Sequence, residues 1–202
     1  MKAKKVGSLL MLLGAALLSA ALLLLVYNVV ENKRANEAAQ SALPAVQETI
    51  ASRSQAATAD SGHEPMMAVT VAGNGYIGVL SLPQLGLELP VLSEWSYPNL
   101  DIGPCRHFGA TETNDLVIAG HDYSMHFGGL PNLTIGAPVR FTDMNGGVYY
   151  YKVGTMEVIP GDAGDYVKNS GWDLVLYTCT YSGRERVMVG ANRVTAEEYS
   201  RL

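Results

Sequence analysis

The N-terminal part of the chain contains one long uncharged segment, residues 7–30. An α-helix needs about 20 apolar residues to cross the roughly 30 Å hydrocarbon layer of a membrane. A cleaved secretory signal is the alternative, but its apolar region is only about 7–15 residues long and small residues follow it at the cleavage site. Here the small residues Ser19, Ala20 and Ala21 lie inside the apolar run. The pattern therefore predicts an uncleaved transmembrane anchor at residues 7–30.

Charge and composition on the two sides of this segment predict its orientation and the character of the next segment. Three lysines precede the anchor, and Lys33 and Arg34 come after it. Excess positive charge stays in the cytoplasm, so we expect residues 1–6 to be the cytoplasmic tip of a single-pass protein whose remainder is extracellular. Residues 31–72 begin with helix formers, are interrupted by Pro44, and then become rich in Ala, Ser, Gln and Thr. Such a segment buries little apolar surface to offset its ordering entropy, and we expect a polar extracellular spacer.

From residue 73 onward, short runs of β-branched and aromatic residues alternate with turn residues, which is typical of strands. The pattern predicts seven strands, at residues 76–82, 87–92, 116–119, 138–142, 148–159, 174–177 and 187–194. Helical patterning is limited to three short segments, residues 96–100, 131–133 and 163–168. We therefore predict a mostly β domain over residues 73–196, with a C-terminal tail at 197–202. A closed or nearly closed β-barrel with short helices fits best, and a β-sandwich is the alternative.

Charge and metal-ligand spacing exclude two classes of function. The chain has a formal net charge of −5 at pH 7 and no basic run in the predicted domain. This distribution lacks the electrostatic footprint of a nucleic-acid-binding protein. His121 and His126 are five residues apart with Asp122 between them, a spacing that fits no common zinc motif. We expect neither a nucleic-acid partner nor a metal site.

Three residues at the ends of predicted strands combine into a candidate catalytic site. Cys179 follows the strand at 174–177, and His121 follows the strand at 116–119. Strand ends place side chains at the rim of a barrel, where a substrate reaches them. Arg186 opens the next strand, and a hairpin brings its guanidinium beside the thiol. A cysteine nucleophile needs a proton donor or acceptor and a group that stabilises the oxyanion, which His121 and Arg186 supply.

Structural interpretations of the same residues stay open at this point. Cys179 also fits a small buried hydrophobe, and a disulfide with Cys105 is the alternative for a protein outside the cell. Arg184 is the rival for the arginine, because it lies two residues before Arg186 and on the same face if the strand starts early. The other domain histidines lack a strand-end setting and are interpreted as loop residues: His107 and His126.

Three motifs around the candidate site resemble those of the sortase family. Leu176, Thr178 and Cys179 match the sortase pattern Thr-Leu-any-Thr-Cys, although Val175 stands where the family usually has threonine. Residues 118–121, Ile-Ala-Gly-His, are similar to the strand that carries the sortase histidine. Residues 186–191 resemble the strand that begins with the sortase arginine. The order histidine, cysteine, arginine agrees as well, and the resemblance covers roughly residues 75–194.

The resemblance implies a fold, a reaction and a set of roles. The fold is an eight-stranded β-barrel with short helices, so we expect an eighth strand around residues 104–109. In the reaction, Cys179 attacks the Thr–Gly carbonyl of a Leu-Pro-any-Thr-Gly-like sorting signal on a secreted protein. An amine of a peptidoglycan precursor or a pilin then resolves the thioester. His121 exchanges protons with the two amines, Arg186 stabilises the oxyanion, and no metal or organic cofactor is required.

Subclass and rival functions complete the expectations. About 14 residues separate the strands at 148–159 and 174–177, which resembles class A or class D more than class B, whose insertion is longer. Calcium activation is not predicted, because the carboxylates Glu88, Glu94 and Asp101 are scattered along the chain. Two rival functions remain: a membrane-anchored cysteine hydrolase without transfer, and a non-catalytic surface domain with Cys179 buried.

Overall fold

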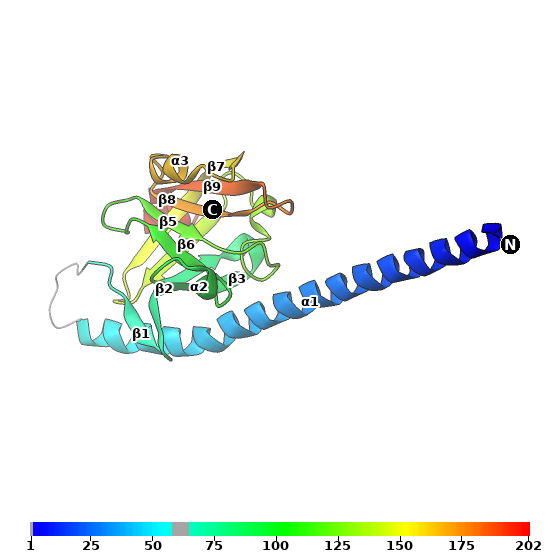
Figure 1. Ribbon diagram of the computed structural model, residues 1–202. Helices are drawn as coiled ribbons and strands as arrows, with labels where there is room; N and C mark the ends of the chain where they lie inside the picture. The colour runs from blue at the N-terminus through cyan, green and yellow to red at the C-terminus, as the bar shows by residue number, and fades with distance from the viewer. Residues whose placement is uncertain (1, 58–64) are drawn as a thin grey trace. The chain divides into compact units, whose positions relative to one another are not determined.

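The computed structural model describes residues 2–57 and 65–202 (Figure 1). The chain divides into two compact units, Met1–Arg34 and Ala35–Leu202, and helix α1 (Lys2–Ala57) contributes to both. In the first unit, large apolar side chains of α1 such as Leu18 and Leu23 are exposed. Within the described residues, one helix is long and apolar enough to cross a membrane, judged by length and composition. The predicted apolar helix is therefore present.

The second unit is built on one sheet that closes into a barrel. The strand order is β1-β2-β3-β4-β5-β8-β9-β7-β6, and β2 also pairs with β6, which closes the ring. Eight strands make the barrel and β1 extends it beside β2, so the predicted barrel is confirmed over the sandwich. The strands are β1 (Val69–Val71), β2 (Asn74–Leu82), β3 (Leu87–Leu92), β4 (Cys105–Phe108), β5 (Leu116–Ala119), β6 (Pro138–Asp143), β7 (Val148–Pro160), β8 (Leu174–Cys179) and β9 (Glu185–Val194).

The local sequence explains most of these boundaries. The seven strands expected from alternation are present, and the eighth lies where the family resemblance placed it, as β4. The turn between β6 and β7 is fixed by Asp143, whose carboxylate accepts hydrogen bonds from the backbone amides of Asn145 and Gly147. Short helices occupy the connections: η1 (Pro83–Leu85), α2 (Tyr97–Leu100), η2 (Leu130–Asn132), α3 (Gly164–Lys168) and α4 (Ala196–Tyr199).

The barrel interior holds the main apolar core. Alternate residues of β6, and of β7 up to Val153, are buried, as expected for strands with one face toward the core. Buried side chains from strands far apart in sequence meet there, for example Leu80, Leu89, Ile118, Leu176 and Val189. Full burial of one such side chain contributes about 1.5–3 kcal/mol. This core holds β5, β8 and β9 in register, and these strands carry the candidate catalytic residues.

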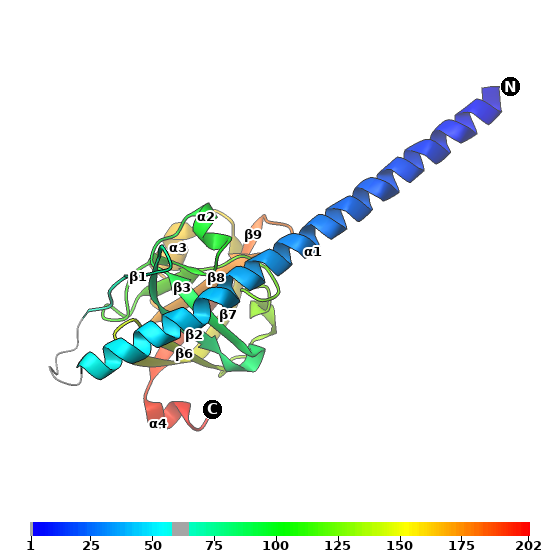
Figure 2. The same ribbon diagram turned by 90° about the horizontal axis from the view of Figure 1, so that it is seen from below.

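The second half of α1 differs from the expectation for residues 31–72. The helix continues through Pro44 to Ala57, and Val46 and Ile50 are buried against Tyr76 and Val79 of β2. Figure 2 shows this part of the helix lying along β1 and β2. Packing of the two apolar side chains offsets the hydrogen bond that proline cannot donate. The segment thus contains core-forming residues; residues 58–64 lie outside the described part of the chain.

Polar contacts add to this packing at the end of the helix. The Nε atom of Arg53 donates to the carbonyl oxygen of Met144 at 3.1 Å, and its Nη2 atom donates to the side chain of Asn145 at 2.9 Å. Both acceptors belong to the turn between β6 and β7. At the other end of the chain, α4 contacts β7 through the ion pair of Lys152 with Glu198. The barrel is therefore covered by segments from both ends of the sequence.

A chain that begins at Gly75 is expected to be markedly less stable than one that begins at Ala35. It lacks Val46 and Ile50, whose burial contributes about 1.5–3 kcal/mol each, out of a typical total of about 5–15 kcal/mol. Thermal melting of the two proteins measures the difference. Within the longer protein, Val46→Asp should lower the melting temperature, whereas Ser52→Asp, on an exposed position of the same helix, should not. Equal melting temperatures for all four proteins would contradict the packing.

Candidate active site

Cys179 is the last residue of β8, and its position is fixed from both sides. On one side, β8 runs parallel to β5, with Tyr177 opposite Ala119. On the other side, β8 pairs with β9 so that Cys179 lies directly opposite Arg186. The thiol side chain is partly exposed, and both cysteines are free. The strand end therefore presents a free thiol to solvent beside an arginine.

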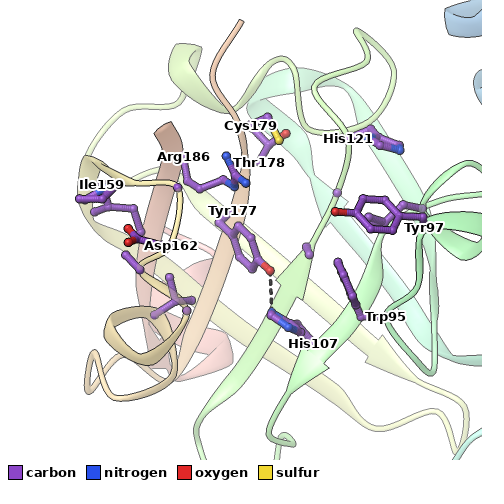
Figure 3. A pocket seen from close by; sticks show the side chains of 18 residues that line it. Trp95, Tyr97, His107, His121, Ile159, Asp162, Tyr177, Thr178, Cys179 and Arg186 are labelled. Carbon is purple, nitrogen blue, oxygen red and sulfur yellow. Dashed lines mark hydrogen bonds between the residues drawn. The ribbon is translucent and has the colours of Figure 1, made fainter. Parts of the chain in front are cut away.

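His121 lies just beyond β5, where a glycine allows the chain to turn closely over a buried ring. A Cβ atom at Gly120 would lie 2.7 Å from the ring of Phe127, so any larger residue would displace the loop. The backbone amide of Phe127 donates to the carbonyl oxygen of His121 at 3.0 Å. The imidazole Nε2 atom lies 3.3 Å from a carboxylate oxygen of Asp101. Figure 3 shows the imidazole across the cleft from Cys179.

Arg186 is the second residue of β9, and its guanidinium contacts its own loop. Its Nη1 atom donates to the carbonyl oxygens of Gly183 and Glu185, both at 3.0 Å. Arg184 lies before β9 in the exposed turn and does not line the cleft. The strand begins at Glu185, two residues earlier than the predicted 187, and Arg186 is the arginine that is paired with Cys179.

These three side chains line one cleft of about 340 Å³. Its walls come from the segment before and within α2, from the end of β7 and its connection to β8, and from the neighbouring strands β4, β5, β8 and β9 with the loop after β5. In Figure 3, Cys179 and Arg186 lie at one end, while Trp95 and His107 lie at the other. The structure therefore brings His121, which is far from the other two in sequence, into one cleft with Cys179 and Arg186.

His107 corrects one interpretation of the sequence. It is a residue of β4 and lines the cleft, whereas it was expected in a loop. Its Nδ1 atom lies 2.5 Å from the hydroxyl of Tyr177. Burial lowers the pKa of His107 and raises the pKa of Tyr177 to about 12. At neutral pH the phenol keeps its proton, and the two side chains share one hydrogen bond.

Cys105 and His126 are placed away from the chemistry. Cys105 is fully buried in β4, and burial raises the pKa of its thiol to about 12. Such a thiol stays protonated at neutral pH and is a poor nucleophile. His126 is buried in the loop after β5, as expected for a loop residue, and does not line the cleft. Over residues 2–57 and 65–202, no group of three or more His, Cys, Asp or Glu side chains is arranged to hold a metal ion.

Comparison with known proteins agrees with this architecture. A family model described as Sortase domain matches residues 80–194, more than half of the chain. No curated protein sequence matches the chain. Among solved structures, a lid mutant of sortase A from Corynebacterium diphtheriae is similar with a TM-score of 0.52 and 19% identity, over 75% of this chain and 95% of that one.

Sortases of other types are similar to the same degree. Sortase C-3 from Streptococcus pneumoniae has a TM-score of 0.53 and 20% identity, over 82% of this chain and 91% of its own. A Clostridium perfringens Sortase D5 transpeptidase has a TM-score of 0.56 and 14% identity, over 79% of this chain and 97% of its own. At these identities the likeness concerns the fold, and the family model carries the assignment. The chain belongs to the sortase family, whose members are cysteine transpeptidases.

Proposed function

We propose that this protein is a membrane-anchored transpeptidase in which Cys179 is the nucleophile, His121 the proton carrier and Arg186 the oxyanion donor. One observation carries the proposal: the cross-strand pairing of Cys179 with Arg186 at the end of the cleft that His121 also lines. The proposed substrate is a secreted protein with a Leu-Pro-any-Thr-Gly-like sorting signal. The proposed acceptor is an amine of a peptidoglycan precursor or a pilin.

In the first half of the reaction, the thiolate of Cys179 attacks the carbonyl carbon of the Thr–Gly bond. The oxyanion that forms is stabilised by the Arg186 guanidinium, which is charged at every physiological pH. The carbon–nitrogen bond then breaks, and protonated His121 donates a proton to the leaving amine. A thioester between Cys179 and the acyl fragment remains.

In the second half, the acceptor amine attacks the thioester carbonyl. His121, now neutral, takes a proton from the attacking amine, and the carbon–sulfur bond breaks to restore the thiolate. In this structure His121 contacts Asp101 and Arg186 contacts its own loop carbonyls, so the proposed reaction requires both side chains to turn toward the substrate. Hydrogen bonds of this kind often reach their catalytic geometry only when substrate is bound. No step in this scheme requires a metal ion or an organic cofactor.

Topology and subclass belong to the same proposal. Sortases are typically membrane-associated, and the apolar first half of α1 supports a single-pass anchor. Lysines before the anchor favour a cytoplasmic N-terminus and an extracellular barrel. The connection between β7 and β8 is short and contains one helix, α3, of five residues. That supports a class A- or class D-like enzyme.

Product analysis in the presence of an amine tests the proposed function. The full-length protein in detergent is incubated with a Leu-Pro-any-Thr-Gly peptide, with and without triglycine. The masses of the products are measured by mass spectrometry. We expect an amide-linked product that contains triglycine. Free acid as the sole product in both reactions would make the protein a hydrolase. No product, together with a Cys179 thiol that resists iodoacetamide, would make it a non-catalytic surface domain.

A further inference from the structure

The imidazole of His121 contacts a carboxylate that the reaction scheme above leaves without a role. The Nε2 atom of His121 lies 3.3 Å from a carboxylate oxygen of Asp101, whose side chain is 70% exposed. His121 lines the cleft, whereas Asp101 does not. The carboxylate therefore lies at the rim of the cleft, in contact with the side chain that is proposed to carry protons.

Helix α2 places this carboxylate beside exposed aromatic surface. Asp101 is the C-cap residue of α2, and its backbone amide donates to the carbonyl oxygen of Tyr97 at 3.3 Å. Residues four positions apart share one face of a helix. Tyr97 lines the cleft and is 71% exposed. Figure 3 shows it on the same side of the cleft as His121, across from Cys179 and Arg186.

A second aromatic ring packs against the imidazole. The ring centroids of Tyr123 and His121 lie 4.8 Å apart. Aromatic faces attract cations, as a carboxylate does. On the other side of the cleft, Arg186 is a fixed cation, and the carboxylate of the cleft wall, Asp162, lies on that side as well in Figure 3. The surroundings of His121 are therefore the part of the site that favours a cationic ligand without an arginine nearby.

The order of proton transfers leaves this carboxylate available when the acceptor arrives. While His121 is protonated, it pairs with Asp101 as one ion with another. In the first half of the reaction His121 gives its proton to the leaving amine, so the carboxylate loses the charge of its partner. Primary amines have pKa values of about 8–10 and are mostly protonated at neutral pH. The acceptor thus reaches the site as a cation just when an exposed carboxylate beside His121 has lost its cationic partner.

We propose that Asp101, together with Tyr97 and Tyr123, forms an ammonium subsite that captures the acceptor as a protonated primary amine and delivers it to His121. The bound ammonium group releases one proton to water. The resulting amine attacks the thioester carbonyl and passes a second proton to neutral His121, as the carbon–nitrogen bond forms and the carbon–sulfur bond breaks. Asp101 stays ionised throughout. This inference rests on the proposed transpeptidase function and names the residues that select its acceptor.

Two nucleophiles that differ in charge test the subsite. Triglycine amide is mostly a cation at neutral pH, whereas hydroxylamine is mostly uncharged, and each converts the thioester into a product of distinct mass. The full-length protein in detergent is incubated with a Leu-Pro-any-Thr-Gly peptide and either nucleophile at a series of concentrations, and kcat/KM for the nucleophile is measured by mass spectrometry. Asp101→Asn should lower kcat/KM for triglycine amide by about 3–5-fold, as expected for one exposed ion pair, and leave that for hydroxylamine unchanged.

Charge reversal and a ring deletion extend the test. Asp101→Lys should lower kcat/KM for triglycine amide by about 10-fold or more, because the new ammonium group repels the acceptor. Added salt should weaken the capture of triglycine amide by the wild type and leave the reaction with hydroxylamine unaffected. Tyr97→Leu should lower kcat/KM for triglycine amide alone, by about 2–5-fold.

Glu94→Gln is the matched control. It removes an exposed carboxylate from the segment just before α2, and this carboxylate is not the one that pairs with His121. Both nucleophiles should react with this variant as they do with the wild type. A loss for triglycine amide as large as that in Asp101→Asn would assign the effect to the overall charge of the protein and overturn the subsite. Thermal melting confirms that each variant is folded.

The remaining outcomes separate the two proposals. If the wild type transfers the acyl group to both nucleophiles and Asp101→Asn lowers neither, the subsite is wrong and the transpeptidase proposal stands. An equal loss for both nucleophiles, together with slower acyl-enzyme formation, would mean that Asp101 acts by holding His121, which also overturns the subsite. If the wild type forms no acyl-enzyme while iodoacetamide labels Cys179, both proposals fail.

Discussion

Replacement of Cys179 with alanine is expected to abolish peptide cleavage and transfer while leaving the barrel folded. The side chain is partly exposed at the end of β8, so its loss opens no cavity in the core. Without the sulfur no thioester forms, and the covalent route is lost entirely. Peptide cleavage followed by mass spectrometry measures the activity, and circular dichroism with thermal melting checks the fold.

Cys105→Ala is the matched control for this variant. Cys105 is fully buried, and its thiol, with a pKa raised to about 12 by burial, contacts the carbonyl oxygen of Gly103. Its loss should lower stability by about 1 kcal/mol through the small cavity left behind, with most activity retained. An inactive Cys105→Ala protein beside an active Cys179→Ala protein would transfer the nucleophile to Cys105 and invalidate the proposed site.

Arg186→Lys should lower the rate by about 10²–10³, which corresponds to roughly 3–4 kcal/mol of transition-state stabilisation. The charge is preserved, but the geometry is not. A planar guanidinium presents several donors in a fixed fork, whereas an ammonium is a compact point charge on a flexible stem. In this structure the Nη1 atom of Arg186 donates to two carbonyl oxygens, those of Gly183 and Glu185. Rates on one peptide, with folding checked by thermal melting, measure the effect.

The neighbouring arginine provides the comparison. Arg184 is exposed in the turn before β9 and does not line the cleft, so Arg184→Lys should keep most of the activity. The two variants carry the same kind of substitution at positions two residues apart, so the comparison controls for the general effect of replacing an arginine with lysine. A near-normal rate for Arg186→Lys together with a severe loss for Arg184→Lys would assign the oxyanion role to Arg184.

Local sequence patterns predicted most of the barrel because strand signals are short-range. Short apolar runs bounded by turn residues predicted the bounds of β3 and β5 as they are in the structure. The expectation of a hairpin after Cys179 was enough to predict that Arg186 lies beside the thiol. The family resemblance supplied the eighth strand, β4. Its four residues are too few for a periodic pattern, and its register is interrupted by the bulge at His107.

Two features depended on contacts between distant segments and were missed. The packing of α1 on the barrel rests on Val46 and Ile50, two apolar residues four positions apart in a stretch that is otherwise rich in small and polar residues. That spacing places both side chains on one face of a helix. It was the signal in the sequence from which the packing of the helix could have been predicted. The second feature is the Tyr177–His107 hydrogen bond, which joins residues 70 positions apart. No local pattern indicates which histidine lies beside that tyrosine.

The closure of the sheet between β2 and β6 has a consequence for how copies of this protein behave at high density. A strand edge with unpaired amides and carbonyls is a template for pairing with another chain, and it promotes aggregation. In this sheet the terminal strand beyond the ring is β1, which has three residues. A barrel with so short an edge offers little surface for strand addition. Copies of this protein at high local concentration can therefore crowd together without their sheets fusing.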